Sequence, residues 1–177
     1  TIESGIVSPA DGLVQRAEIK KGMVYFSIFM NVHNVHVNRS PFDGRVISIK
    51  HKSGGYLPAF SKDSDKNERL LTKIETPIGV MKIIQIAGVL VRRIVSYVKP
   101  NSEVAKGERI GLIHFGSRVD LSFESAGIDL SVKKGDKVLA GQRLANYTPL
   151  SSLSTSEKIF EVPKRMFSKL QASQSED

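Results

Sequence analysis

Short runs of alternating apolar and polar residues, separated by glycine-containing turns, limit this chain to a fold built mainly from β-strands. Alternation with a period of two places apolar side chains on one face of a strand and polar side chains on the other. Glycines fall between the runs, as in residues 53–55 (SGG) and 134–136 (KGD), where tight turns need them. The expected strands cover residues 12–19, 23–32, 44–51, 79–87, 109–115, 118–123 and 127–132.

The alternation runs through a Gly-Ser pair in the stretch GLIHFGSRVDLSF, residues 111–123. This stretch is predicted to form one plain, half-buried strand with the pair in its middle. Every second residue from Ile113 to Phe123 is apolar except Ser117, which shares their face. The sequence therefore places a hydroxyl among buried side chains, directly after Gly116.

The expected hairpins predict a mainly β fold, α+β with few short helices, around a β-sandwich or barrel-like core. Two internal echoes support repeated hairpin units: SPADGLV with SPFDGRV, and VAKGERIGLI with VKKGDKVLAGQRLA. Such glycine-tipped hairpins resemble those of lipoyl and biotinyl carrier domains. A non-catalytic carrier-like β module is therefore one interpretation, although no lysine stands out as the exposed hairpin-tip residue that a carrier needs. Residues 90–98 fit either a strand or a short helix.

The length of 177 residues suits one β-rich domain over residues 1–150. Residues 151–177 are polar and serine-rich with a short basic patch, and are expected to form a partly disordered tail. The absence of cysteine excludes disulfides and thiolate metal sites. No apolar run reaches the 18 residues of a spanning helix, and the start at Thr1 without methionine leaves room for a preceding anchor segment.

The formal net charge of +8 suits an anionic partner, either a membrane surface or a nucleic acid. Aromatic residues make up only 7% of the chain and do not interleave with basic ones, as they do in single-strand binders. No nucleic-acid-binding motif is recognisable. An anionic membrane surface is therefore the expected partner, and no nucleic acid is expected.

Four features carry side chains capable of chemistry. They are Asp11 in SPADG, the histidines His33 and His36 in NVHNVHVN, the segment Asn67-Glu68-Arg69, and the pair Gly116-Ser117. Residues three apart in a regular strand point to opposite faces, so the chain must bend between the two histidines if both serve one site. Ser, His and Asp together are the parts of an activated nucleophile.

Metal binding is not expected from these residues. H-x-x-H offers only two ligands, and no third is placed by a helix or a cysteine pair. The segment DSDKNE, residues 63–68, is similar to the start of a calcium loop. It has Glu68 where the loop needs glycine and Ile74 where it needs a bidentate acid.

Two chemistries remain open for the serine. A serine hydrolase using Asp11, His36 and Ser117 would leave the chain intact, but HFGSRVD lacks the exposed G-x-S-x-G elbow. Alternatively, Ser117 attacks the carbonyl of Gly116, which has no side chain to obstruct the approach. This N-to-O acyl shift gives an ester, and β-elimination of the ester breaks the chain and leaves a pyruvoyl group.

An ordered set of motifs resembles the phosphatidylserine decarboxylase family in its short form. The motifs are SPADG, VHNVHVNRSPFDG, the NER of residues 67–69, FGSRVDL and GDKVLAGQRLA, which together cover residues 5 to 147. The better-known form of the family has Leu-Gly-Ser-Thr at its cleavage site, whereas this chain has Phe-Gly-Ser-Arg.

The resemblance implies a role for each matching residue. Ser117 corresponds to the self-cleaving serine that becomes the pyruvoyl cofactor, and Gly116 ends the larger fragment, residues 1–116. The smaller fragment is then residues 117–177. His36 corresponds to the base of the processing triad and Asp11 to the carboxylate that orients it. His33 corresponds to the histidine implicated in decarboxylation.

The resemblance also implies a reaction and a substrate. The pyruvoyl ketone condenses with the headgroup amine of phosphatidylserine, or archaetidylserine, to form a Schiff base, and carbon dioxide leaves. His33 is expected to reprotonate the α-carbon. Asn67, Glu68 and Arg69 are expected to contact the substrate. Apart from the resemblance, Phe60 and residues 90–98 are candidates for taking up the apolar part of the lipid, with core packing as the alternative role for each. A pyruvoyl enzyme acting on a small soluble amino acid is the related alternative.

The resemblance further leads us to expect a peripheral membrane protein on the cytoplasmic face, with its two fragments associated and assembled as a homodimer.

Overall fold

The computed structural model describes residues 2–31, 36–55, 66–88, 94–113 and 116–149. Within these ranges the regular structure consists of strands, and no α-helix occurs. In chain order the strands are β1 (Ile6–Val7), β2 (Gly12–Lys20), β3 (Met23–Met30), β4 (Val37–Arg39), β5 (Gly44–Lys52), β6 (Arg69–Thr76), β7 (Gly79–Ile86), β8 (Ile94–Ser96), β9 (Glu103–Val104), β10 (Arg109–Ile113), β11 (Ser117–Glu124), β12 (Ile128–Leu130), β13 (Lys137–Val138) and β14 (Arg143–Tyr147).

One eight-stranded sheet, in the order β13-β2-β3-β11-β7-β6-β5-β9, forms the base of the molecule. Every pair in it is antiparallel. β11 is an interior strand, hydrogen-bonded to β3 on one side and to β7 on the other. Ser117 is its first residue and lies opposite Met30, the last residue of β3.

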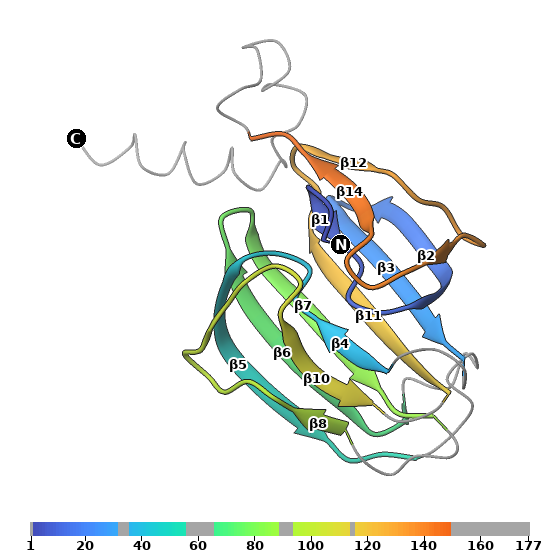
Figure 1. Ribbon diagram of the computed structural model, residues 1–177, viewed down its shortest axis with the longest axis vertical. Helices are drawn as coiled ribbons and strands as arrows, with labels where there is room; N and C mark the ends of the chain where they lie inside the picture. Colours follow the sequence, from blue (N-terminus) through green and yellow to red (C-terminus); the bar gives the residue numbers. More distant parts are fainter. Residues whose placement is uncertain (1, 32–35, 56–65, 89–93, 114–115, 150–177) are drawn as a thin grey trace, which may run out of the picture.

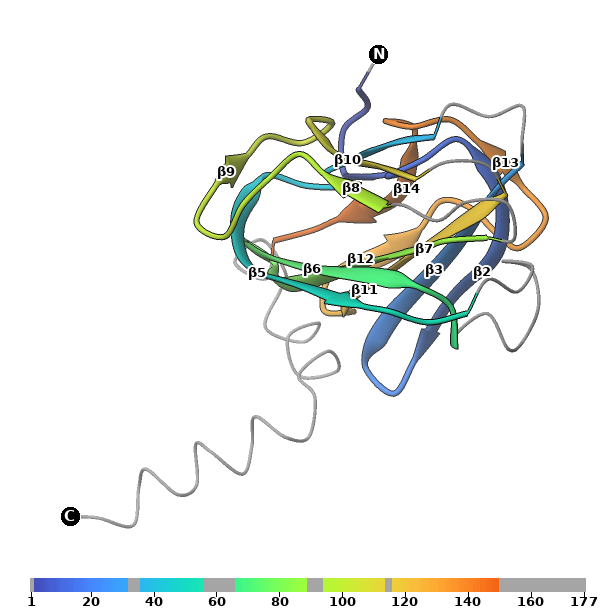
Figure 2. The same cartoon turned by 90° about the horizontal axis from the view of Figure 1, so that it is seen from below.

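Two three-stranded sheets, β4-β10-β8 and β1-β14-β12, complete the fold. Figure 1 shows β4 and β10 in front of the large sheet, and Figure 2, turned by 90°, shows β8, β10 and β14 as a layer above it. The inward side chains of both layers form one apolar core. On β11 this core takes Val119, Leu121 and Phe123, while the alternate residues face outward.

The mainly β prediction is confirmed, and most expected strands lie within two residues of where the pattern placed them. β6 was not predicted, although Leu70, Thr72 and Ile74 alternate inward along it. Of residues 90–98, Ile94–Ser96 form strand β8. The 151–177 tail lies outside the described residues.

The prediction of one continuous strand over residues 111–123 is wrong. β10 ends at Ile113 and β11 begins at Ser117, and the two strands belong to different sheets. Gly116 has a φ of 66°, a left-handed conformation that breaks the extended chain. The sequence alternates without interruption across this break, because β10 and β11 both point their odd-numbered residues, such as Ile113 and Val119, into one core. The Gly-Ser pair therefore marks a sheet-to-sheet crossing.

No helix among the described residues has both the length and the apolar character needed to cross a membrane.

Candidate active site

The Gly116–Ser117 peptide bond lies at the end of the large sheet, where the chain crosses from β10 to β11. Among the described residues other than its chain neighbours, a Cβ at Gly116 would meet nothing within 4 Å, so the space beside its α-carbon is open. The positive φ of 66° turns the backbone just before the serine. This conformation favours glycine, which is what the sequence has at this position.

The Ser117 side chain is fully buried, with 0% of its surface exposed. Its Oγ has no hydrogen-bond partner among the described residues. Leaving a buried hydroxyl unpaired costs about 1–3 kcal/mol. Such an atom in a well-packed fold calls for an explanation. A nucleophile positioned next to the carbonyl that it attacks provides one.

His36 lies beside the chain that leads into this bond. Its carbonyl accepts a hydrogen bond from the Ile113 amide, at 3.1 Å, and the next residue, Val37, pairs with Leu112 of β10. Ile113 is only three residues before Gly116. The His36 side chain is 9% exposed, so it faces the interior of the fold.

Asp11 is held at the same end of the large sheet, at the start of β2. Its Oδ1 accepts a hydrogen bond of 2.6 Å from the Ala140 amide. Leu13 of β2 pairs with Phe29 of β3. On the other side of β3, the neighbouring Met30 pairs with Ser117 of β11. With adjacent strands about 4.8 Å apart, Asp11 lies roughly 10 Å from Ser117 by backbone position. Figure 1 shows the end of β3, the end of β10 and the start of β11 in this region.

The structure thus brings the segments of Asp11, His36 and Ser117 to one end of the molecule. The sequence alone separates them by up to about a hundred positions. His33 and Phe60 lie outside the described residues.

Asn67 and Glu68, predicted to contact substrate, are buried and hold the fold together. The Asn67 amide donates to the Ala87 carbonyl at 2.8 Å, which ties the start of β6 to the end of β7. Glu68 lies 3.1 Å from the ring Nε2 of His51. These contacts give both residues a structural role, and their contact with substrate stays a prediction.

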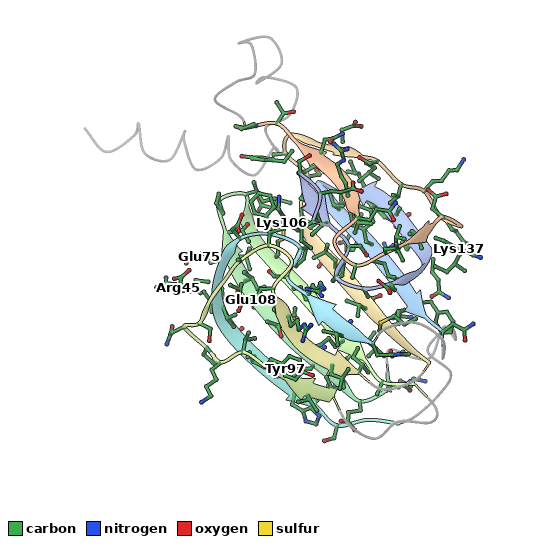
Figure 3. All side chains as sticks on the ribbon, viewed as in Figure 1. Arg45, Glu75, Tyr97, Lys106, Glu108 and Lys137 are labelled. Carbon is green, nitrogen blue, oxygen red and sulfur yellow. The ribbon has the colours of Figure 1, made fainter. Side chains whose placement is uncertain are left out.

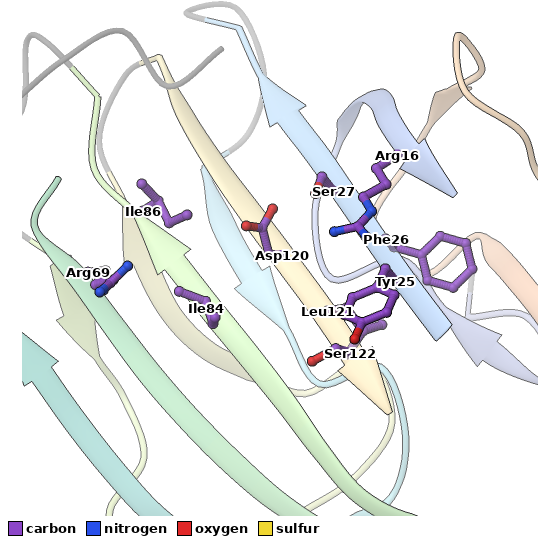
Figure 4. Close-up of a pocket in the computed structure, with 10 residues that line it drawn as sticks. All are labelled: Arg16, Tyr25, Phe26, Ser27, Arg69, Ile84, Ile86, Asp120, Leu121 and Ser122. Carbon is purple, nitrogen blue, oxygen red and sulfur yellow. The ribbon is translucent and has the colours of Figure 1, made fainter. Parts of the chain in front are cut away.

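Arg69 lies on the outer face of the large sheet, opposite to the face that buries Ser117. Its pairing partner Ile86 also pairs with Arg118, so these three residues form one row across β6, β7 and β11. Arg69 and Ile86 line an outer cavity of about 220 Å³ (Figure 4). Asp120, which also lines it, forms an ion pair of 2.9 Å with Arg118.

Among the described residues no group of three or more His, Cys, Asp or Glu side chains is arranged to hold a metal ion.

Comparison with known proteins assigns the chain. The model of the family described as phosphatidylserine decarboxylase matches residues 1–146. The chain belongs to the phosphatidylserine decarboxylase family. It is 52% identical over 135 residues to a putative archaetidylserine decarboxylase proenzyme of Methanococcoides burtonii, covering 76% of this chain and 62% of that protein.

It is also 48% identical over 137 residues to a phosphatidylserine decarboxylase proenzyme of Streptomyces avermitilis, covering 77% of this chain and 63% of that protein. The chain thus spans somewhat over three-fifths of the length of these curated relatives. A solved structure of the glucose permease IIA protein from Mycoplasma capricolum is 17% identical, with a TM-score of 0.49 over 79% of this chain and 92% of the other, and adds nothing to the assignment.

Beside the candidate active site of this decarboxylase-family chain is a buried polar link that sequence reasoning missed. Gln85 on β7 donates from its Nε2 to Oδ1 of Asn38 on β4, at 2.7 Å. The Asn38 amide lies 3.5 Å from the sulfur of Met30, the residue that pairs with Ser117. Both polar side chains are almost fully buried. Gln85 lies on the same inward face of β7 as Met81 and Ile83. A polar residue in this apolar series was the one feature of the sequence that could have indicated a buried hydrogen bond here.

We expect Gln85→Leu to lower the free energy of unfolding by about 1–3 kcal/mol, because Asn38 Oδ1 then loses its buried donor. Self-cleavage at Gly116–Ser117, which the family resemblance leads us to expect, should slow as well, since β4 follows His36 directly. Urea unfolding of the uncleaved chain and time-resolved mass analysis measure the two effects. The double variant Asn38→Leu/Gln85→Leu removes both partners and should lose less stability than the sum of the two single variants. Additive losses would show that the two side chains are not coupled.

Proposed function

We propose that this chain cleaves itself between Gly116 and Ser117 and then acts as a pyruvoyl-dependent decarboxylase of phosphatidylserine or archaetidylserine. The observation that carries the proposal is the buried Ser117 hydroxyl, without a described hydrogen-bond partner, next to a left-handed glycine. Two relatives of comparable identity, 52% and 48%, have names that include the word proenzyme, one for each lipid.

The cleavage starts at the chain's own atoms. Ser117 Oγ gives up its proton and attacks the carbonyl carbon of Gly116, and the bond from that carbon to the Ser117 nitrogen breaks. The product is an ester with a free amine at residue 117. Removal of the Ser117 α-proton then expels the Gly116 carboxylate, and water replaces the nitrogen, which leaves as ammonia. The smaller fragment is left lighter than one with an N-terminal serine by the mass of ammonia.

His36 is the residue we assign to proton removal from Ser117 Oγ, and Asp11 the one that supports His36. Both lie in segments that reach the end of the sheet where the bond is cut. The Asp11 carboxylate is fixed by the Ala140 amide, so its position does not depend on the histidine. We further assign His33 to the return of a proton to the substrate α-carbon.

The site fits a pyruvoyl group. The group would form from the backbone and side chain of residue 117, at the buried start of β11, the strand between β3 and β7. Its ketone would supply a carbonyl that accepts the electron pair released when carbon dioxide leaves the substrate. The role of the protein is to hold this position in a fixed strand, away from bulk water.

A hydrolase serine sits on an exposed G-x-S-x-G elbow between a strand and a helix, whereas Ser117 is buried at the start of a strand and lacks that motif. Incubation with a fluorophosphonate probe distinguishes self-cleavage from hydrolysis of an external substrate. A hydrolase becomes labelled and remains a single chain, whereas the proposed enzyme is cut and its Ser117 is consumed.

The net charge of +8 supports a further proposal, that the protein binds the cytoplasmic surface of an anionic membrane that holds its substrate. A homodimer remains part of the proposed assembly.

We expect His36→Gln to slow the appearance of the two fragments by at least about 100-fold, the lower end of the usual contribution of a general base. The matched control is His51→Gln. His51 is half-exposed and contacts Glu68 rather than the cleavage site. Denaturing mass spectrometry over time measures both variants, followed by release of labelled carbon dioxide from phosphatidylserine vesicles. Normal cleavage of His36→Gln would remove His36 from the assigned role, and a cut protein that releases no carbon dioxide would contradict the decarboxylase proposal.

A further inference from the structure

An apolar groove opens on the large sheet beside the turn that fixes Asp11. It encloses about 420 Å³, a volume in the range of ligand pockets. Leu13, Phe29, Val138 and Leu139 supply its apolar lining, and Lys137 and Asn31 are polar residues on its wall. The groove is therefore built by β2, β3 and the β13 segment.

Leu139 projects from this groove into solvent on a rigid turn. It is 66% exposed, the largest value among the exposed large hydrophobic residues described. Its amide donates to Gln142 Oε1 at 3.0 Å, and the Gln142 amide donates back to its carbonyl at 2.9 Å. The Gly141 amide fastens the turn to the Ser8 carbonyl at 2.9 Å. A large apolar side chain is thus held outside the fold instead of folding back onto it.

Three exposed lysines, Lys133, Lys134 and Lys137, precede this apolar projection in the same segment. Two acids lie within or beside the segment. The Asp136 carboxylate accepts from the Lys133 amide at 2.9 Å, and the Asp11 carboxylate accepts from the Ala140 amide at 2.6 Å. Figure 3 shows Lys137 at the edge of the molecule, on the side away from the Arg45–Glu75 ion pair. An apolar tip next to basic side chains is typical of proteins that lie on anionic lipid.

The groove lies at the same end of the large sheet as the Gly116–Ser117 bond, on the outer face of the sheet. Phe29 of its lining pairs with Arg118, the residue after Ser117, and Asn31 follows Met30, which pairs with Ser117. Since alternate residues of a strand face opposite sides, the groove and the buried Ser117 side chain lie on opposite faces of this end of the sheet. A protein docked through the groove would hold this end of the sheet at the lipid surface.

We propose that the groove and the turn Lys133–Leu139 form the surface that docks this protein on an anionic lipid bilayer. Leu139 enters the acyl region, and the three lysines contact headgroup phosphates. The proposal rests on the proposed function, since a lipid substrate must be reached within its bilayer. A second copy of the chain fits less well, because a two-fold contact here would bring the lysines against one another.

The chain contains no tryptophan, so one introduced at the tip becomes the sole indole reporter. With Leu139→Trp, vesicles of phosphatidylglycerol and phosphatidylcholine should shift the emission to the blue, and brominated lipid should quench it. The matched control is Ile19→Trp. Ile19 is 48% exposed and lies toward the far end of β2, about 23 Å from Gly12 at the usual strand rise. Its emission should not change.

The charge part of the proposal is tested by neutralising two lysines. Lys134→Gln/Lys137→Gln should weaken vesicle binding roughly 30-fold, since each lysine at an anionic surface contributes about a factor of five. The control Lys20→Gln/Lys21→Gln removes the same charge at the other end of β2 and should bind within about twofold of the unchanged protein. Complete self-cleavage of each variant shows that it has folded.

An unshifted Leu139→Trp spectrum on vesicles that bind the protein would overturn this surface, as would equal weakening by both lysine pairs. A Leu139→Glu variant that changes from dimer to monomer while still binding vesicles would assign the surface to a second copy. Turnover of short-chain, water-dispersed phosphatidylserine separates the two proposals. If docking variants retain this turnover, the chemistry stands independently of the surface. If even the unchanged protein lacks it, the proposed function has failed.

Discussion

Ser117→Ala is expected to leave the protein as one uncut chain of 19.5 kDa with no decarboxylase activity. The alanine keeps the strand and its burial but removes the oxygen that attacks the Gly116 carbonyl. The hydroxyl has no described hydrogen-bond partner, so its removal should leave the melting temperature unchanged or slightly higher. Loss of cleavage without loss of stability is therefore the expected combination, measured by denaturing mass spectrometry and thermal unfolding.

Ser122→Ala provides the control on the same strand. Ser122 lines the outer cavity, and its replacement should leave cleavage complete. If Ser117→Ala still yielded two fragments, another residue would have to supply the nucleophile. If it instead unfolded the chain, the serine would be a structural residue of the core.

Gly12→Ala is expected to have the largest effect on stability. A Cβ at this position would collide with the carbonyl oxygen of Phe29 and lie 2.9 Å from its carbonyl carbon. Backbone atoms cannot move aside as side chains do, so β2 must separate from β3. We expect a loss of about 2–3 kcal/mol, or roughly 5–10 °C in melting temperature for a chain of this length. Asp11 precedes this glycine, so cleavage should slow in parallel.

The measurement is best made in the Ser117→Ala background, where the chain stays intact and unfolding is not confused with cutting. Gly55→Ala is the matched control, because among the described residues its Cβ would meet just the Asn67 side chain, at 4.0 Å. That variant should keep its stability within about 1 kcal/mol of the parent. Equal losses in both variants would mean that the close approach at Gly12 does not matter.

The period-two pattern located the longer strands other than β6, because each buries one face in a shared core. It could not locate the sheet crossing at Gly116, since strands from two sheets present the same parity of residues to that core. Short strands such as β1 and β13 have two residues each, too few for any periodicity. They form because longer neighbours offer them hydrogen bonds.

The candidate site was recognised from motifs rather than from spacing. The segments that carry Asp11, His36 and Ser117 reach one end of the molecule only through the register of strands distant in sequence, which no local pattern encodes. The link between Asn38 and Gln85 was missed for the same reason, as two uncharged residues 47 positions apart carry no joint signal. Asn67 and Glu68 belong to a recognisable motif, yet their described contacts are structural.

The interior position of β11 affects how the protein can refold before and after the proposed cleavage. This strand starts at the bond that we propose is cut, so the smaller fragment would contribute the strand between β3 and β7 of the larger one. Before the cut, folding is a unimolecular search by one chain. After it, the same architecture is a complex of two chains, whose recovery from unfolding depends on protein concentration. Maturation would then convert a protein that refolds by itself into one that must reassemble.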